Sequence, residues 1–277
     1  VRLRWTPDES ARLISEVYDV DLAEVSAVWY RRPVPPVLPS SLTLEQARWA
    51  MAEAREALEG VWRAMDVRWV NHPDRNGPAS SKPAQLRAAK ALGFEVPDTL
   101  MTNDPDAARP FVVEHPAGVV VKPLRSGRLS VDGDERLFFT TLLTDPNQVP
   151  FERLGAEPYV FQAHVAKRAD VRVTVIGDEA FAVRIHSQDD TETRIDFRRA
   201  DPNRLRHEPF ELPTDVQGRC IALVTDAGCL FGAIDLAERD DGSFVFFENN
   251  PSGQWAWIEQ LTGLPLRAQL ADLLLAP

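Results

Sequence analysis

The chain has 277 residues and 44% of them are apolar, so it can bury a sizeable core as one large domain or two to three small ones. Its net charge of −11 argues against nucleic acid or anionic lipid as a partner. No stretch has the roughly 20 apolar residues of a membrane helix, and the first 20 residues lack the apolar core of a signal peptide. We therefore expect a cytoplasmic protein with no nucleic-acid and no membrane partner.

The first 75 residues read as a small lobe. A short strand at 25–29 leads into a proline-rich connector at 31–39, which cannot be helical. Thr43 and Gln46 have the spacing of a capping box, and apolar residues at three-and-four spacing predict a helix from Thr43 to Met65 with one buried face. A strand at 67–70 follows, and 71–78 reads as a loop and a domain boundary.

The middle of the chain combines helix and strand signals. A second helix is predicted from about Ser81 to Gly93, which suits a left-handed C-cap. The β-branched run at 118–122 predicts a buried strand that ends in Lys122. Residues 125–135 read as a mobile loop.

From Tyr159 onward strands dominate, at 159–164, 171–176 and 180–186, followed by a helix around 216–224. A hairpin at 230–239 and 244–249 comes next, and two amphipathic helices close the chain. The pattern predicts an α+β fold in several lobes. Cys220 and Cys229 have no further Cys or His at metal spacing, so we expect two buried thiols.

The last hairpin carries a candidate metal site. Glu248 and Asn250 are two residues apart in a strand and point to the same face. A four-residue loop would pair Arg239 with Phe244 and place Asp235 opposite Glu248. With no Lys or His beside them, the two carboxylates repel each other unless a cation lies between, and oxygen-only ligands suit Mg²⁺.

The alternative to a metal site is a solvated polar sheet face. Residues 244–247 make the strand strongly apolar, which favours the metal interpretation.

Two lysines are candidate phosphate ligands: Lys122 at the end of a predicted strand and Lys82 at the start of a predicted helix. Each alone is also compatible with an ordinary surface lysine, and the pair is more informative than either one.

Basic residues follow the predicted strands of the C-terminal part. Arg172 projects on the face opposite Val171 and Val173, and Asp170 precedes it. A surface ion pair is an equal alternative to phosphate binding. We expect a charged cleft over the sheet, to which neighbouring strands contribute Arg184, His186, Arg194, Asp196 and Arg198. His186 is a candidate base, with a structural histidine as the alternative.

No Walker loop or dinucleotide fingerprint is present, so nucleotide phosphates would be held by dispersed cations and metal. This arrangement resembles the ATP-grasp superfamily from about residue 71 to the C-terminus. The resemblance implies two α+β lobes that clasp ATP. It assigns Lys82, Lys122 and Arg172 to the phosphates, Gln162 and Val165 to the adenine hinge, Asp170 to the ribose, and Asp235, Glu248 and Asn250 to Mg²⁺.

Within that superfamily, the segments at 82–99, 172–177, 195–198 and 250–255 look most like graspetide synthetases. This resemblance implies an ADP-forming ligase that phosphorylates Asp or Glu side chains of a ribosomally made precursor peptide, with leader and core parts. Ser, Thr or Lys side chains would then close macrocyclic esters or amides. Catalytic roles would fall to Arg172, Arg184, Arg198 and His186, and we expect a homodimer.

The expected organisation is an N-terminal pre-ATP-grasp lobe at 1–75 that is incomplete relative to the family, a central lobe at 76–158 and a C-terminal lobe at 159–277 with the metal site. Two alternatives to macrocyclisation stay open. One is a ligase that adds a free amino acid to a peptide or protein carboxylate, and the other is a nucleotide- or peptide-binding module without turnover.

Overall fold

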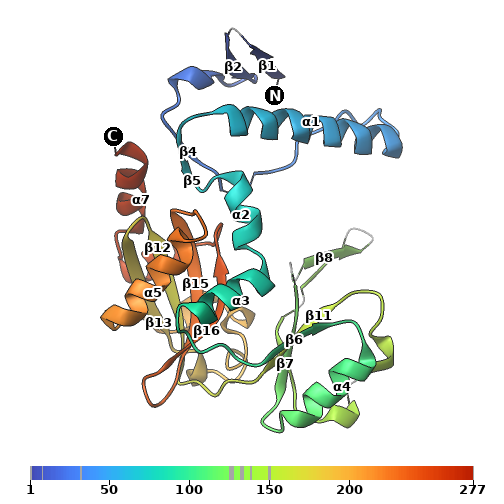
Figure 1. Cartoon of the computed structure of the whole chain (residues 1–277), viewed down its shortest axis with the longest axis vertical. Coiled ribbons are helices and arrows are strands. Elements are labelled where there is room, and N and C mark those ends of the chain that lie inside the picture. Colours follow the sequence, from blue (N-terminus) through green and yellow to red (C-terminus); the bar gives the residue numbers. More distant parts are fainter. Residues whose placement is uncertain are drawn as a thin grey trace.

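The computed structural model describes residues 2–7, 9–31, 33–124, 128–131, 134–137, 139–148 and 151–276. Helices and sheets are mixed throughout, which confirms the predicted α+β class. Figure 1 shows three parts: an upper part built around α1, a large sheet with α5 and α7, and a smaller sheet with α4. None of the helices in this described part is both long and apolar enough to cross a membrane.

The N-terminal part contains two small sheets. Three antiparallel strands open the chain, β1 (Arg2–Thr6), β2 (Glu9–Ile14) and β3 (Asp19–Asp21), and the sequence analysis did not predict them. The parallel strands β4 (Ala27–Trp29) and β5 (Arg68–Val70) are connected by α1 (Leu44–Ala64). This β-α-β unit confirms the predicted strand–helix–strand order.

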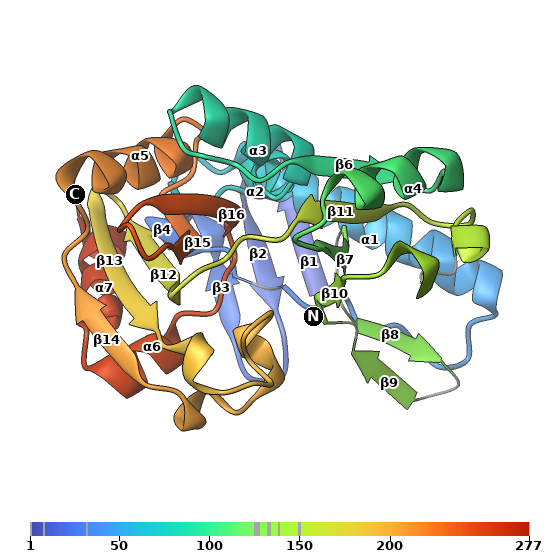
Figure 2. The same cartoon turned by 90° about the horizontal axis from the view of Figure 1, so that it is seen from below.

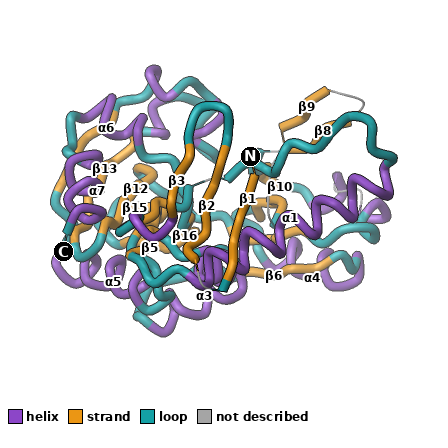
Figure 3. The backbone as a smooth tube through the Cα atoms, turned by 90° about the horizontal axis from the view of Figure 1, so that it is seen from above, coloured by secondary structure: helices purple, strands orange, loops and turns teal. Residues whose placement is uncertain are grey.

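Helix α1 has the predicted cap but not the predicted burial. Thr43 Oγ1 accepts from the Gln46 N–H, and Gln46 Oε1 accepts from the Thr43 N–H. Val61 alone among its residues is buried, because the small β1–β3 sheet covers only the C-terminal turns. The N-terminal half extends beyond that sheet (Figure 3), and Leu44 and Trp49 there are 66% and 69% exposed.

The predicted loop at 71–78 is wrong, since α2 (Pro73–Ala79) occupies it. Pro73 stands at the first helical position, where a missing N–H has no penalty, and His72 Nδ1 accepts from the Asp74 N–H. The buried Asn71 side chain accepts from the N–H groups of Leu230 and Phe231 and donates to the carbonyls of Phe231 and Pro251. Asn71 therefore ties the end of the N-terminal part to the large sheet.

The smaller sheet has the order β10-β7-β11-β6, with all neighbours antiparallel. Its strands are β6 (Thr99–Thr102), β7 (Val119–Pro123), β10 (Thr141–Leu143) and β11 (Tyr159–Ala163), and α4 (Pro105–Glu114) covers it. The boundary expected at 158/159 falls just before β11, which is paired with β7 and β6. The connection from β11 into the large sheet is visible in Figure 2.

The expected loop at 125–135 contains an antiparallel hairpin, β8 (Arg128–Val131) and β9 (Asp134–Leu137). The remainder of that loop, at 125–127 and 132–133, lies outside the described residues.

The large sheet has the order β14-β13-β12-β15-β16, again antiparallel throughout. The strands are β12 (Ala169–Ile176), β13 (Glu179–Ile185), β14 (His207–Phe210), β15 (Phe231–Glu238) and β16 (Phe244–Asn250). One face packs on α5 (Thr214–Thr225) and α3 (Lys82–Ala91), and Cys220 and Cys229 are buried, unpaired thiols there as predicted. The other face packs on α6 (Ala256–Thr262) and α7 (Leu266–Leu275) at one end and is lined by charged residues at the other.

Candidate functional site

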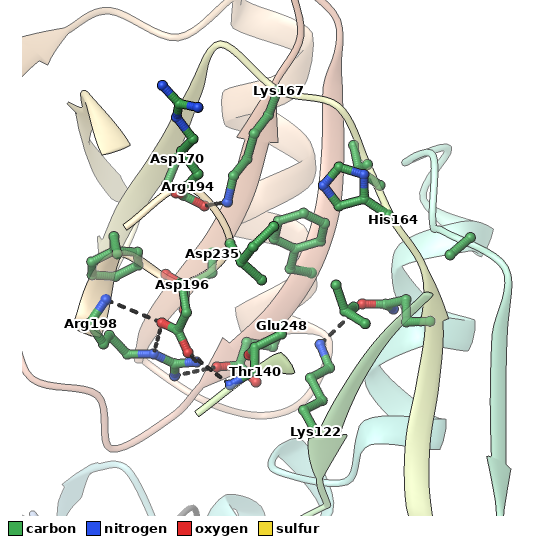
Figure 4. A pocket seen from close by; sticks show the side chains of 17 residues that line it. Lys122, Thr140, His164, Lys167, Asp170, Arg194, Asp196, Arg198, Asp235 and Glu248 are labelled. Atoms are coloured by element: carbon green, nitrogen blue, oxygen red, sulfur yellow. Dashed lines mark hydrogen bonds and ion pairs between the residues drawn. The ribbon is translucent and has the colours of Figure 1, made fainter. Parts of the chain in front are cut away.

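A cavity lies between the smaller and the large sheet. The smaller sheet contributes Lys122 from β7 and Gln162 from β11, and the large sheet contributes Asp235 and Glu248 (Figure 4). The connection between the sheets forms another wall with Val165 and Lys167, and Asp170 at the start of β12 adjoins it. The segment 194–198 closes the remaining side.

A row of charged side chains crosses the cleft face of the large sheet. Arg172 on β12 is the direct partner of Asp235 on β15, and Asp235 is the direct partner of Glu248 on β16. Arg172 Nε lies 2.8 Å from Asp235 Oδ1, and Lys82 Nζ at the start of α3 lies 2.6 Å from Glu248 Oε2. Each buried carboxylate thus has a cation of its own.

Both carboxylates have neighbouring cations, contrary to expectation. The two carboxylates were expected to lack neighbouring cations and so to require a metal. The cations come from β12 and from α3, which are distant in sequence, and the described residues contain no group of three His, Cys, Asp or Glu side chains arranged to hold a metal. Any metal would have to compete with Lys82 and Arg172 for these oxygens.

The hairpin reaches the predicted pairing of Asp235 with Glu248 by an unexpected route. Phe244 pairs with Glu238, not with Arg239, so the register near the loop was predicted one residue out. A bulge at Phe247 then restores the pairing of Asp235 with Glu248. Because the bulge adds one residue, Phe247 and Glu248 both face the cavity, which strict alternation would forbid.

Asn250 lies on the same strand face as Glu248, as predicted, and its Nδ2 donates to Glu248 Oε1 over 3.1 Å. It orients the carboxylate and does not line the cavity itself.

Burial and charge act in opposite directions on the two carboxyl groups. Burial raises the pKa of Asp235, and Arg172 only partly opposes this effect. Burial also acts to raise the pKa of Glu248, but the positive charges of Lys82, Lys122 and Arg198 outweigh it and hold that pKa well below the usual range. Glu248 is therefore the firmly charged member of the pair.

Lys122 is a cation without a carboxylate partner among the described residues. Its Nζ donates to Gln162 Oε1 over 3.1 Å and lies 6.0 Å from the centre of the Phe247 ring. Burial lowers the pKa of Lys122 to about 8, although Glu248 opposes the shift. A partly buried ammonium group without an anion is a receptive partner for phosphate.

Lys167 is a cavity residue that the sequence analysis missed. Its Nζ lies 2.7 Å from Asp170 Oδ1 and 5.7 Å from the centre of the Phe247 ring, while Asp170 Oδ2 is buried without a partner. The i, i+3 spacing of Lys167 and Asp170 was the available signal. Phe247 was not predicted as a cavity residue, because the alternation of a strand does not reveal a bulge.

Arg194, Asp196 and Arg198 were expected on strands, but the segment that holds them contains short 3₁₀ turns, including Phe197–Arg199. Arg198 donates to both oxygens of Asp196 and lies 3.7 Å from Glu248 Oε1. Asp196 also accepts from the Thr140 N–H of the smaller-sheet part. Arg198 is therefore held at the cavity from both sides of the cleft.

Arg184 and His186 lie elsewhere, contrary to expectation. Arg184 is two residues from Ala182 in β13, so both side chains point to the same face of the sheet. Ala182 packs in the core beneath α5, and Arg184 therefore lies on the face opposite Arg172. It pairs with Glu238 and Glu208, and His186 Nε2 lies 3.1 Å from Glu208 Oε2. Neither side chain lines the cavity.

Comparison with known proteins gives a consistent set of relatives. A sequence model described as the MvdD pre-ATP grasp domain matches residues 4–76. A search among curated proteins found no match.

Solved structures resemble the chain over almost its whole length. A RiPP-associated ATP-grasp ligase from Chryseobacterium gregarium, in complex with ADP and a leader and core peptide, is 28% identical with a TM-score of 0.88 and covers 99% of this chain and 83% of that one. The macrocyclase MdnC from Microcystis aeruginosa MRC, bound with precursor peptide MdnA, is 27% identical with a TM-score of 0.85, over 99% and 85%. The ATP-grasp ligase PsnB, with a phosphomimetic variant of its minimal precursor, Mg and ADP, is 27% identical with a TM-score of 0.68, over 89% and 79%. The fold is the ATP-grasp fold.

Removing one member of the charge row should destabilise the protein strongly. Arg172→Met leaves Asp235 buried without its cation, and we expect the free energy of unfolding to fall by about 3–5 kcal/mol. Adding Asp235→Leu should recover at least half of the loss, since no charge is then stranded. Urea denaturation measures both variants. Arg204→Met, which removes an exposed ion pair, is the control and should leave the midpoint nearly unchanged. A double variant no more stable than Arg172→Met would contradict this account.

Proposed function

From the premise that this chain is an ATP-grasp ligase, we propose that it phosphorylates Asp or Glu side chains of a ribosomally made precursor peptide with Mg-ATP and closes macrocyclic esters or amides. The observation that carries the proposal is the cavity between the two sheets, which Lys122, Arg198, Asp235 and Glu248 line. Lys82 and Arg172 do not line it but pair with Glu248 and Asp235. The peptides bound to the similar ligases supply the substrate class.

We assign the nucleotide to the cavity by the chemistry of its walls. Lys122 and Lys82 would contact phosphates, Gln162 and Val165 would border the base, and Asp170 would lie near the ribose. The buried Asp170 Oδ2 without a partner supports a hydrogen bond to a sugar hydroxyl. Phe247, whose ring lies near Lys122 and Lys167, adds an apolar surface for the base.

The residues fit a magnesium ion that arrives with phosphate. Asp235 and Glu248 offer carboxylate oxygens, which Arg172 and Lys82 contact, Glu248 is held charged, and Asn250 has an amide oxygen on the same strand face. Such an all-oxygen set, with one or two carboxylates and phosphates completing the shell, suits Mg²⁺. The bound ion would supply neutralisation of phosphate charge.

The proposed reaction has two steps. A peptide carboxylate oxygen forms a bond to the γ-phosphorus of ATP while the bond from that phosphorus to the β-phosphate oxygen breaks, which releases ADP. A Ser or Thr hydroxyl or a Lys amine then attacks the acyl carbon, loses its proton and displaces phosphate. Arg172 and Arg198 would stabilise the charge on the transferred group. We assign no chemical role to Arg184 and His186, because both pair with Glu208 and neither contacts Asp235 or Glu248.

Each crosslink should remove one water from the peptide. With Mg-ATP and a precursor peptide, mass spectrometry should show this loss together with ADP and phosphate. Glu248→Gln should reduce turnover by about 100-fold or more, since a charged ligand is lost, while the exposed control Glu211→Gln should not change it. A gain equal to one amino acid would favour the alternative ligase. Stabilisation by ATP without ADP release would favour a binding module.

Nucleotide affinity should depend on pH through Lys122. Phosphate prefers the charged ammonium, whose pKa is about 8 in the free protein. Affinity should therefore be constant near pH 7 and fall by up to about tenfold per pH unit above pH 8. Calorimetric titration with AMPPNP between pH 7.5 and 9.5 measures this. Lys122→Arg, which stays charged, should bind without the fall, whereas Lys90→Arg on the exposed side of α3 should retain it. A pH-independent wild type would exclude this role of Lys122.

We also propose a homodimer. The support is the N-terminal half of α1, whose Leu44 and Trp49 are largely exposed in a single chain. Light scattering coupled to gel filtration should give twice the chain mass, and Trp49→Glu should shift the protein to monomer; a monomeric wild type would contradict the proposal.

A further inference from the structure

The candidate metal position is already neutralised by the protein. Lys82 Nζ lies 2.6 Å from Glu248 Oε2, and the side chains of both residues are about 15% exposed. Arg198 approaches the other oxygen of Glu248 at 3.7 Å. The neighbouring Asp235 is paired with Arg172. A bare divalent cation would therefore meet two carboxylates whose charge is already compensated.

Lys82 is held at this position by its own helix. Gln85 lies three residues further on the same face of α3, and its Oε1 accepts from the Asn249 N–H of β16. Gln85 Nε2 donates to the Ser80 carbonyl over 3.3 Å. Since β16 is the edge strand of the sheet, this side chain occupies the hydrogen-bonding position of a missing neighbour strand. The helix is thus docked in register, with Lys82 beside Glu248 and Gln85 beside Asn249.

The charge count favours a ligand that brings its own anions. The cavity and the two ion pairs beside it hold six cations and four carboxylates, which leaves two positive charges in excess: Lys82, Lys122, Lys167, Arg172, Arg194 and Arg198 against Asp170, Asp196, Asp235 and Glu248. A free cation would have to displace Lys82 into a cavity that is already positive. A polyphosphate would accept Lys82 and Lys122 as partners and free the Glu248 oxygens for the accompanying cation.

We propose that Lys82 is a specificity-determining residue that makes this site reject free divalent cations and admit them only together with a polyphosphate. The inference rests on the proposed nucleotide function and adds an order of loading to it. The metal site would then stay empty until the nucleotide binds.

The test measures Mn²⁺ binding by electron paramagnetic resonance, which does not depend on turnover. Without nucleotide, the wild type should leave millimolar Mn²⁺ free, and Lys82→Met should bind it about tenfold tighter or more, because one unit charge next to Glu248 is removed. Lys82→Arg should behave like the wild type. Lys90→Met removes a charge from the exposed side of the same helix and is the matched control. Thermal melting with each variant verifies that it is folded.

A second arm adds AMPPNP. Wild type should then bind Mn²⁺, whereas the same nucleotide without protein gives the background. If the wild type binds free Mn²⁺ as tightly as Lys82→Met while AMPPNP still increases binding, the inference about Lys82 is overturned and nucleotide binding stands. If AMPPNP binds to neither protein, the proposed function fails and the inference fails with it.

Discussion

Two carboxylates buried side by side on adjacent strands are the constraint around which this structure is arranged. Asp235 and Glu248 are direct partners across β15 and β16, and at this spacing like charges destabilise a sheet unless each is compensated. Compensation comes from Arg172 on one side of the pair and from Lys82 on the other. The site therefore exists only when three strands and a helix are assembled together.

The same constraint explains why α3 packs along β16, the edge strand of the large sheet. Strand β16 would otherwise present an open edge next to the charged pair. Gln85 and the carbonyl of Glu95 satisfy N–H groups along that edge, at Asn249 and Phe246. An edge covered in this way cannot pair with another strand. The register in which α3 docks on this edge determines the position of Lys82.

The cavity is completed by residues from both sides of the cleft. Lys122 and Gln162 come from the smaller sheet, and Asp196 connects Thr140 of that part to Arg198 beside Glu248. The Phe247 ring lies within about 6 Å of both the Lys122 and the Lys167 ammonium groups. A nucleotide placed here would be in contact with both lobes, which is consistent with a ligase of the ATP-grasp fold.

Local patterns in the sequence determined most of the elements. The capping box at Thr43, the left-handed glycine after the helix at Gly93, the strand that contains Lys122 and the alternation around Arg172 all depend on interactions within a few residues. The structure contains each of them, although the strand extends one residue further, to Pro123. The hairpin was also predictable because it is a local structure, but Asp235 faces Glu248 as predicted only because the bulge at Phe247 offsets a register error of one residue. The assignments of individual residues to ATP and Mg²⁺ came from the resemblance and stay predictions.

Only the tertiary structure decided how the charges are paired. Lys82 and Glu248 are 166 residues apart, and no spacing rule connects them. Asn71 likewise bonds to Phe231 and Pro251, which are 160 and 180 residues away in sequence. A short segment determines which way a side chain points, but the partner that neutralises a buried charge is chosen by whichever element packs against it.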